Sequence, residues 1–159
     1  MKFYSADSYQ AQCLEKFQYY QYKIAVVLPN AVIEHIGSSA VDGLISKGDL
    51  DIYVAVPFSQ MNFTIAQIQQ LGFHEKLDTL RTEALCMLSH NSDDQLAIQV
   101  VAQGSEFEFF ITFRDKLRQS TALCEQYNAL KMSCEGMSED EYRSKKAQFI
   151  EDVLTQHST

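Results

Sequence analysis

The chain has 159 residues, of which 46% are hydrophobic, and this length is sufficient for one folded domain with a core. Its formal net charge of -8 at pH 7 argues against a protein that coats nucleic acid or an anionic membrane, because such binders need an excess of Lys and Arg. A small anionic substrate stays compatible with this charge if metal ions or a local basic cluster offset the negative field.

The first predicted element is an amphipathic helix over residues 8–28. Four of its residues recur at helical spacing: Leu14, Phe17, Gln21 and Ile24. Pro29 follows directly and ends the helix, because proline cannot continue it.

Two strands are expected next, on either side of a loop. Residues 31–36 are short and β-branched, and Gly37 stops them. Residues 50–56 place alternate apolar side chains on one face and are bounded by Pro57. The loop between these strands contains the sequence GSSAVDGLISKGD.

The middle of the chain predicts a helix followed by short strands. Apolar residues recur at three-residue steps between residues 59 and 72 and end at a glycine suited to a helix C-cap. Residues 73–77, 82–88 and 95–101 are each of strand length, with a polar turn before the last. We therefore expect an α/β (α+β) fold with a mixed sheet of four or five strands.

After Gly104 the apolar spacing favours helices to the end of the chain. Ser138 and Glu141 fit a capping box, and the residues after them form one apolar stripe. No linker or repeat interrupts the chain, so we expect one domain over residues 1–159. Its core would span about 1–103 and its C-terminal helices about 104–157.

Asp49 and Asp51 stand at the start of the second strand. Side chains two residues apart in a strand emerge on the same face, with α-carbons about 6.6 Å apart. Two carboxylates this close repel each other, and hard oxygen ligands of this kind suit Mg²⁺ or Mn²⁺ bound together with phosphate oxygens. In phosphoryl transfer one ion activates the attacking hydroxyl and a second, about 3.5 to 4 Å away, neutralises the leaving pyrophosphate.

The turn at Gly37, Ser38 and Ser39 offers the complementary phosphate-binding part. A glycine allows close approach of the backbone, and N–H and hydroxyl groups can receive phosphate oxygens. Gly-Ser, about ten residues and then Asp-x-Asp resembles the nucleotidyltransferase superfamily signature. The alternative is an ordinary turn, with Asp49 capping the strand and Asp51 solvated at a sheet edge.

A longer resemblance points to one family. The run IEHIGSSAV with Gly43, Leu44 and Lys47 resembles the opening motif of the GrpB family, and FRDKLR, YNALK and Tyr142 with Lys145 or Lys146 and Phe149-Ile150 follow in that family's order. The resemblance covers about residues 33–154. It implies a nucleotidyltransferase-like α/β core with helices added at the C-terminus, in a family whose biochemical activity is poorly defined.

Two departures from the family pattern bear on the metal. Asp49 stands where many members have an apolar residue, which makes this chain look more like a working nucleotidyltransferase. In the strand at 95–101, active members of the superfamily add a third carboxylate, whereas this chain has the uncharged Gln99. Asp94, Glu83 or Glu108 are candidates to replace it, and one metal ion is a safer expectation than two.

Basic side chains and one histidine are the remaining candidates. Lys47 lies in the loop between Gly37 and Asp49, where a bound phosphate would be near. Arg114, Arg118 and Lys131 could converge into a phosphate clamp, although charges on helices are usually just solvated. His35 could orient a ligand, but between apolar residues it is more often a hydrogen-bonded structural residue.

The cysteines and the apolar runs indicate the compartment. Four cysteines lie far apart without a CxxC pair, as in a protein with reduced thiols. No apolar run approaches the length of a membrane span, and the N-terminus lacks the apolar core of a signal peptide. We therefore expect a cytoplasmic protein that does not bind membranes.

Two functional hypotheses follow from the sequence. In the first, the protein binds a nucleoside triphosphate with Mg²⁺ or Mn²⁺ and transfers a nucleotidyl group to an unidentified hydroxyl acceptor. Asp49 and Asp51 would hold the metal, and Gly37, Ser38, Ser39 and Lys47 the phosphates. In the second, the chain keeps the fold as a non-catalytic module that binds a nucleotide, a phosphorylated ligand or a protein partner.

Overall fold

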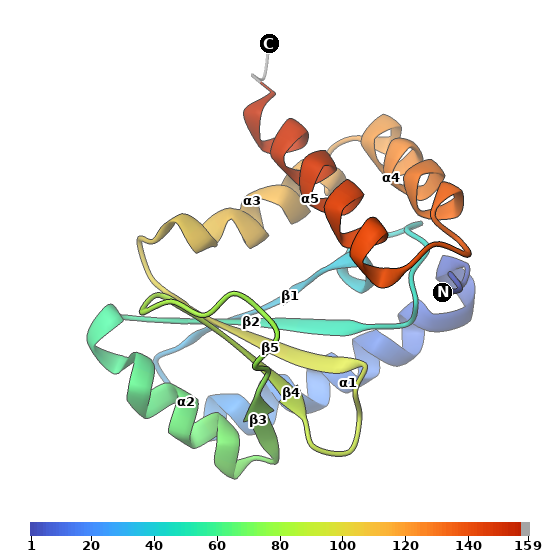
Figure 1. The fold of residues 1–159 in the computed structure, drawn as a ribbon. Helices are drawn as coiled ribbons and strands as arrows, with labels where there is room; N and C mark the ends of the chain where they lie inside the picture. Colours follow the sequence, from blue (N-terminus) through green and yellow to red (C-terminus); the bar gives the residue numbers. More distant parts are fainter. Residues whose placement is uncertain (157–159) are drawn as a thin grey trace.

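The computed structural model describes residues 1–156, which form a sheet with helices on both sides (Figure 1). The helices are α1 (Ala6–Val27), α2 (Met61–Gln70), α3 (Phe109–Arg118), α4 (Thr121–Ser133) and α5 (Glu139–Thr155). The strands are β1 (Val32–Ile36), β2 (Leu50–Val56), β3 (Phe73–Glu75), β4 (Leu85–His90) and β5 (Leu96–Ala102). Three short 3₁₀ helices connect them: η1 (Ser38–Ala40), η2 (Phe58–Gln60) and η3 (Glu106–Glu108).

The sheet has five strands in the order β1-β2-β5-β4-β3. The central strands β2 and β5 pair in parallel, and the other neighbours are antiparallel. This confirms the expected mixed sheet. Both central strands are buried along nearly their whole length, as is usual for parallel strands covered on two faces.

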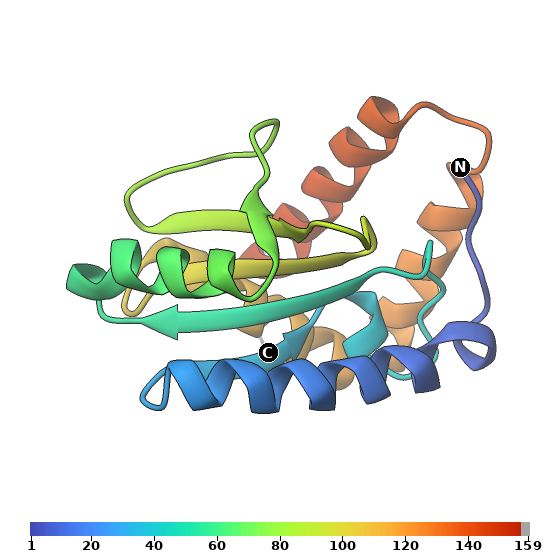
Figure 2. The same cartoon turned by 90° about the horizontal axis from the view of Figure 1, so that it is seen from below.

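One face of the sheet is covered by α1 and α2, and we call it the packed face (Figure 2). Alternate residues of β2 and β5, among them Ile52, Val54 and Ile98, are fully buried there. The predicted buried face of α1 was partly wrong, because the Leu14 side chain is 49% exposed. The buried residues of this helix are instead Tyr9, Cys13, Phe17 and Ile24.

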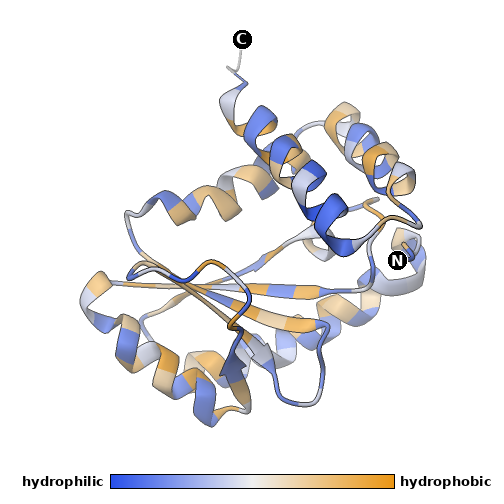
Figure 3. Cartoon of the chain, in the orientation of Figure 1, coloured by the Kyte–Doolittle hydropathy of each residue, from blue (hydrophilic) through white to orange (hydrophobic). Residues whose placement is uncertain are grey.

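The opposite face carries α3, α4 and α5, and we call it the pocket face. Tyr53, Ala55 and Val101 pack there against Phe107. The hydropathy colouring shows orange along the strands and much blue along α5 (Figure 3). The helices on this face therefore meet the sheet through a mixture of apolar and polar contacts.

The helices expected after Gly104 are present as α3, α4 and α5, and residue 157 of the expected helical part lies outside the described residues. The Ser138 hydroxyl accepts a hydrogen bond from the Glu141 backbone N–H at 3.2 Å, which is half of the expected capping box. Within residues 1–156, no helix combines the length and apolarity needed to cross a membrane.

The strand expected at 82–88 begins three residues later, at Leu85. Thr82 and Leu85 exchange backbone hydrogen bonds across a tight turn, and this pairing leaves Thr82 to Ala84 outside the ladder. The third strand is likewise shorter than expected and ends at Glu75. As a result, residues 76–84 form a loop that reaches the pocket face.

Candidate functional site

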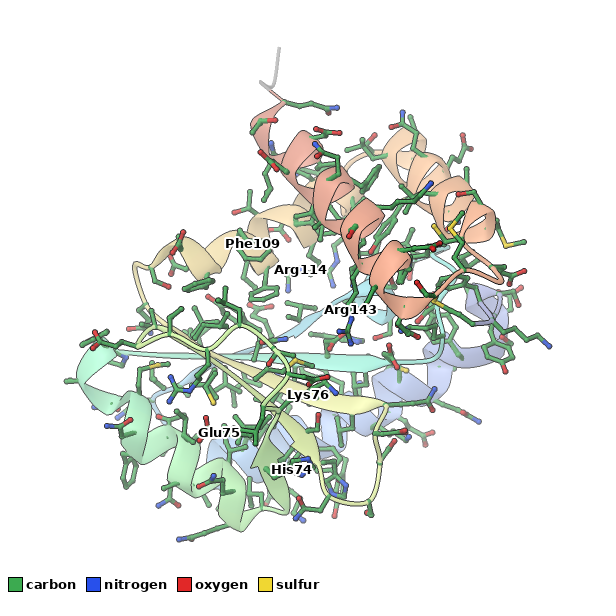
Figure 4. The ribbon with its side chains drawn as sticks, in the orientation of Figure 1. His74, Glu75, Lys76, Phe109, Arg114 and Arg143 are labelled. Carbon is green, nitrogen blue, oxygen red and sulfur yellow. The ribbon has the colours of Figure 1, made fainter. Side chains whose placement is uncertain are left out.

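A cavity of about 480 Å³ lies between the pocket face and helices α3 and α5. Residues of the loop at 76–84 and of α4 complete its walls. Figure 4 shows Arg114 and Arg143 in the space between the sheet and these helices. We refer to this cavity as the main pocket. Its size is in the range of small-molecule sites in proteins.

Both candidate metal ligands line the main pocket. Asp51 is the second residue of β2, opposite Ile36 of β1, and Asp49 comes just before the strand. Each is partly buried, and neither carboxylate has a hydrogen-bond or ion-pair partner within residues 1–156. Their common orientation, expected from the two-residue period of a strand, brings two unpartnered acids to one cavity.

The surroundings of these acids disfavour their charge. Burial raises the pKa of the Asp51 carboxyl to about 6; the charge of Lys146 opposes this effect and that of Asp49 reinforces it. Burial also raises the pKa of Asp49. A divalent cation would relieve both the desolvation and the mutual repulsion, since it favours the charged form of each group.

Gly37 forms the turn directly beside Asp51. Its φ of 77° lies in the region that favours glycine. A Cβ atom at this position would lie 2.7 Å from Oδ2 of Asp51, which is closer than real contacts allow. The glycine therefore permits the Asp51 carboxylate to sit against the turn.

Ser38 faces the main pocket and is held by a buried lysine. Nζ of Lys131 donates hydrogen bonds to the Ser38 hydroxyl and, at 2.6 Å, to the Ile45 carbonyl. It also lies 4.1 Å from the centre of the Tyr127 ring. Lys131 is only 1% exposed, and burial lowers its pKa well below the usual range. The predicted clamp residue thus fixes both ends of the loop between Ser38 and Ile45.

Ser39 and His35 lie behind the turn, and neither lines the main pocket. Their side chains share a hydrogen bond of 2.7 Å, and the His35 ring stacks on Phe17 of α1. Burial, together with the charges of Arg118 and Arg114, lowers the pKa of His35 to about 4. These contacts agree with the structural interpretation of His35. They leave the Ser39 hydroxyl hydrogen-bonded to His35 and outside the main pocket, away from where we expected it to bind phosphate.

The two arginines of the predicted clamp do not converge. Arg118 donates two hydrogen bonds to the Ala40 carbonyl and lines a different surface depression. Arg114 does reach the main pocket, but its guanidinium is engaged by Glu34 at 2.8 Å and by Asp115. Both guanidinium groups therefore bind backbone carbonyls or acidic side chains of the fold, and they do not form a joint phosphate clamp.

Asn128 is an anchor that the sequence did not single out. Its side-chain oxygen accepts from the Ile45 backbone N–H at 3.0 Å, and its side-chain nitrogen donates to the Gly43 carbonyl at 2.9 Å. Together with Lys131 it ties α4 to the loop that leads to Asp49. The only sequence signal was its place in the motif YNALK.

Helix α5 supplies a further wall that the sequence analysis did not assign. Its pocket-lining residues follow helical spacing: Glu139, Tyr142, Arg143, Lys146 and Ile150. Glu139 forms an ion pair of 3.2 Å with Lys47, the expected phosphate ligand. Both members of this pair line the main pocket, so Lys47 is near the acids but not free of partners.

Within residues 1–156 no third carboxylate joins the acid pair to form a metal site. Gln99 of β5 lines the pocket, paired with Tyr53 of β2 and Met87 of β4. The expected replacements lie elsewhere: Asp94 and Glu83 are exposed outside the lining, and Glu108 lines another depression. Among residues 1–156 there is no group of three acidic, histidine or cysteine side chains placed to bind a metal ion. Two hard carboxylates fit one divalent cation completed by water or phosphate oxygens.

Comparison with known sequences assigns relatives to the chain. The family model described as GrpB protein matches residues 6–156. A UPF0157 protein of Vibrio cholerae serotype O1 is 53% identical over 156 residues, which cover 98% of this chain and 83% of that protein. A UPF0157 protein of Deinococcus radiodurans is 28% identical over 143 residues, covering 87% of this chain and 74% of that protein.

Solved structures share the fold at lower identity. The GrpB protein of Enterococcus faecalis superimposes with a TM-score of 0.77 at 21% identity, covering 96% of this chain and 94% of that chain. The Cid1 poly(U) polymerase with MgGTP bound has a TM-score of 0.59 at 14% identity, covering 79% of this chain and 42% of that chain. A cytoplasmic RNA terminal U-transferase gives 0.55 at 14% identity, with coverage of 78% and 39%. The fold is therefore nucleotidyltransferase-like, and the chain matches less than half of each of these two enzymes.

Proposed function

The chain belongs to the GrpB family, and from this premise and the chemistry of the main pocket we propose that it transfers a nucleotidyl group from a nucleoside triphosphate to a hydroxyl acceptor. The transfer depends on one divalent cation, Mg²⁺ or Mn²⁺. Asp49 and Asp51 hold this cation, and Gly37, Ser38 and Lys47 bind the phosphates. The four free cysteines, together with the absence of a membrane-crossing helix in residues 1–156, support a reducing compartment such as the cytoplasm.

One observation carries the proposal: two carboxylates share a pocket without any partner among the described residues. Burying an acid without a partner costs free energy, so such a pair is uncommon unless a ligand completes it. The neighbouring turn at Gly37 and Ser38 suits phosphate oxygens. The enzymes of similar fold, one of them solved with MgGTP bound, make a nucleotide and a metal the natural candidates.

The reaction needs the following from this chain's residues. A bound cation would supply Lewis-acid stabilisation of the charge on the triphosphate. Asp49 and Asp51 would hold the cation beside the turn, while the Ser38 hydroxyl and Lys47 bind the outer phosphates. The acceptor oxygen bonds to the α-phosphorus as the bond to the bridging oxygen breaks. Pyrophosphate leaves with that electron pair, and the acceptor proton passes to solvent water.

A second candidate is a binding module without catalysis. Gln99 favours it, because this residue lies on β5 opposite Tyr53, lines the main pocket and adds no charge that would complete a second metal site. Such a module would bind a nucleotide or another phosphorylated ligand in the same pocket. The two candidates share the pocket and differ in turnover.

Thermal unfolding with each nucleoside triphosphate, with and without Mg²⁺, tests both candidates. A site filled at 100 times its dissociation constant adds about 2.7 kcal/mol of stability, which corresponds to several degrees for a chain of this length. We expect a shift that requires both nucleotide and Mg²⁺. The absence of any shift would contradict the transferase and the nucleotide-binding form of the module.

Transfer is then measured with labelled nucleotide and cell extract. Asp51→Asn should abolish it, whereas the matched control Asp42→Asn should not, because Asp42 is exposed and lies outside the main pocket. A nucleotide-dependent shift without transfer would select the binding module. Transfer that survives Asp51→Asn would contradict the assigned metal ligand.

A further inference from the structure

The main pocket gathers positive charge in a protein whose net charge is -8. Six basic side chains line it: Lys47, Lys76, Arg114, Lys131, Arg143 and Lys146. Three of them already form ion pairs, with Glu139, with Asp78, and with Glu34 and Asp115. A fourth, Lys131, is buried in the hydrogen bonds that hold the turn.

The other two, Arg143 and Lys146, make no ion pair with any residue of the described chain. They lie three positions apart on α5 and so share its pocket side. Arg143 is exposed, whereas Lys146 is partly buried. Lys146 is therefore the unpaired cation that lies deeper in the pocket.

Lys146 lines the main pocket together with Asp49 and Asp51. Yet it stays beyond the 4.0 Å of an ion pair with either acid. The acids and the ammonium thus face a common space that a ligand with negative oxygens can enter.

Four acids line the main pocket, and two of them, Asp78 and Glu139, are paired with lysines. The remaining two offer ligands for one divalent cation and not for two. Asp49 and Asp51 together carry two negative charges, which balance one divalent ion. The next polar group on the sheet is Gln99, on the strand beside β2, and it is uncharged. A second ion close to the first would need further acidic ligands, because the repulsion between two divalent ions is large at a separation of about 3.5 to 4 Å.

We propose that the Lys146 ammonium takes the place of a second divalent cation and binds the pyrophosphate part of the triphosphate opposite the single metal held by Asp49 and Asp51. This inference rests on the proposed site and names a residue and a metal count for it. In the transfer step Lys146 stabilises the negative charge that builds on the leaving pyrophosphate, as a fixed positive group does in a partly dry site. No proton moves to or from Lys146.

The test counts bound Mn²⁺ by the loss of the free-ion electron paramagnetic resonance signal, with pyrophosphate as the probe. We expect one Mn²⁺ per chain in the wild type with saturating pyrophosphate. Lys146→Gln should keep this count and weaken pyrophosphate binding about 10-fold or more, the effect of losing a charge-assisted hydrogen bond. Lys146→Arg should retain most of the affinity.

Two further variants separate this role from a structural one. Lys145→Gln is the matched control, because Lys145 is exposed and does not line the pocket, and its affinity should equal that of the wild type. The double variant Gln99→Asp with Lys146→Gln exchanges the ammonium for a third acid and should bind two Mn²⁺ per chain. Gln99→Asp alone, which keeps the ammonium, should still bind one Mn²⁺ per chain, and a second ion in this single variant would contradict the role of Lys146.

Two Mn²⁺ per wild-type chain, or equal pyrophosphate affinity in Lys146→Gln and wild type, would overturn the inference. A wild type that binds neither Mn²⁺ nor pyrophosphate would overturn it as well. Because no turnover is measured, the inference can stand while transfer is absent: one Mn²⁺ and a Lys146-dependent pyrophosphate site without transfer would contradict only the catalytic part of the proposed function.

Discussion

The packed face and the pocket face of the same sheet are built by different means. On the packed face, α1 and α2 lie on fully buried residues such as Ile52 and Ile98. On the pocket face, the C-terminal helices are tied to the loop after β1 by side-chain hydrogen bonds from Arg118, Asn128 and Lys131. Apolar packing on one side supplies stability, and polar anchors on the other hold a cavity open.

Neighbouring residues of one strand serve both purposes. Along β2, Ile52 faces the packed core while Asp51 faces the main pocket, because side chains alternate across the sheet. An acid at the start of an otherwise apolar strand is tolerated because its side chain faces a cavity and not the packed core. The comparison predicts that substitutions one residue apart have opposite effects on stability.

The largest effect is expected on the packed face. Ile52→Ala should lower the free energy of unfolding by about 2–5 kcal/mol, because Ile52 is 0% exposed and its loss leaves a cavity. Chemical denaturation measures this change. Tyr22→Ala on α1 is the control and should be nearly neutral, since Tyr22 is 72% exposed. A loss below about 1 kcal/mol for Ile52→Ala would contradict the description of this face.

The pH dependence of His35, on the packed face, should be nearly as large. Its pKa is about 4 in the folded chain against 6.5 for the free side chain, so the unfolded chain binds more protons between these values. Stability therefore falls as the pH drops from about 6.5 to 4, by about 3 kcal/mol. Denaturation of His35→Gln across this range should lack this component, and an unchanged pH profile would contradict a buried neutral imidazole.

Asp51 on the pocket face should give the opposite sign. Its pKa is about 6 when folded against 3.8 for the free side chain, so stability is lost as the pH rises through this range. Asp51→Asn should raise the free energy of unfolding by about 3 kcal/mol at pH 7, and the gain should vanish below pH 4. Comparing variant and wild type at each pH removes the contribution of His35. A destabilised Asp51→Asn at pH 7 would contradict an unpartnered acid.

The polar anchors should show the smallest effect. Asn128→Ala removes two hydrogen bonds to the loop and should cost about 1–2 kcal/mol, since each such bond contributes about 1 kcal/mol. Gln126→Ala, at an exposed position of the same helix, is the matched control. Hydrogen exchange of the Ile45 amide should also rise in Asn128→Ala. Unchanged protection there would mean that the loop does not depend on this anchor.

The sequence predicted the strands, the helical C-terminal part and the common side of Asp49 and Asp51, because each depends on local spacing. The roles of Asn128 and Lys131 could not be predicted, since they depend on how α4 lies against a loop more than eighty residues earlier. The hydrogen bond between the Ser39 hydroxyl and His35 could not be predicted either, because it depends on how the chain turns after β1. The place of Lys146 in the main pocket depends on how α5 lies relative to the acid pair, which local spacing does not determine.

The most direct test of the metal site is a crystal structure with Mn²⁺ and a non-hydrolysable nucleoside triphosphate, using the anomalous signal of manganese. We predict one manganese peak within coordination distance of both the Asp49 and Asp51 carboxylates, with the phosphates against the turn at Gly37 and Ser38. A manganese peak away from these two acids, or a nucleotide bound outside the main pocket, would contradict the account.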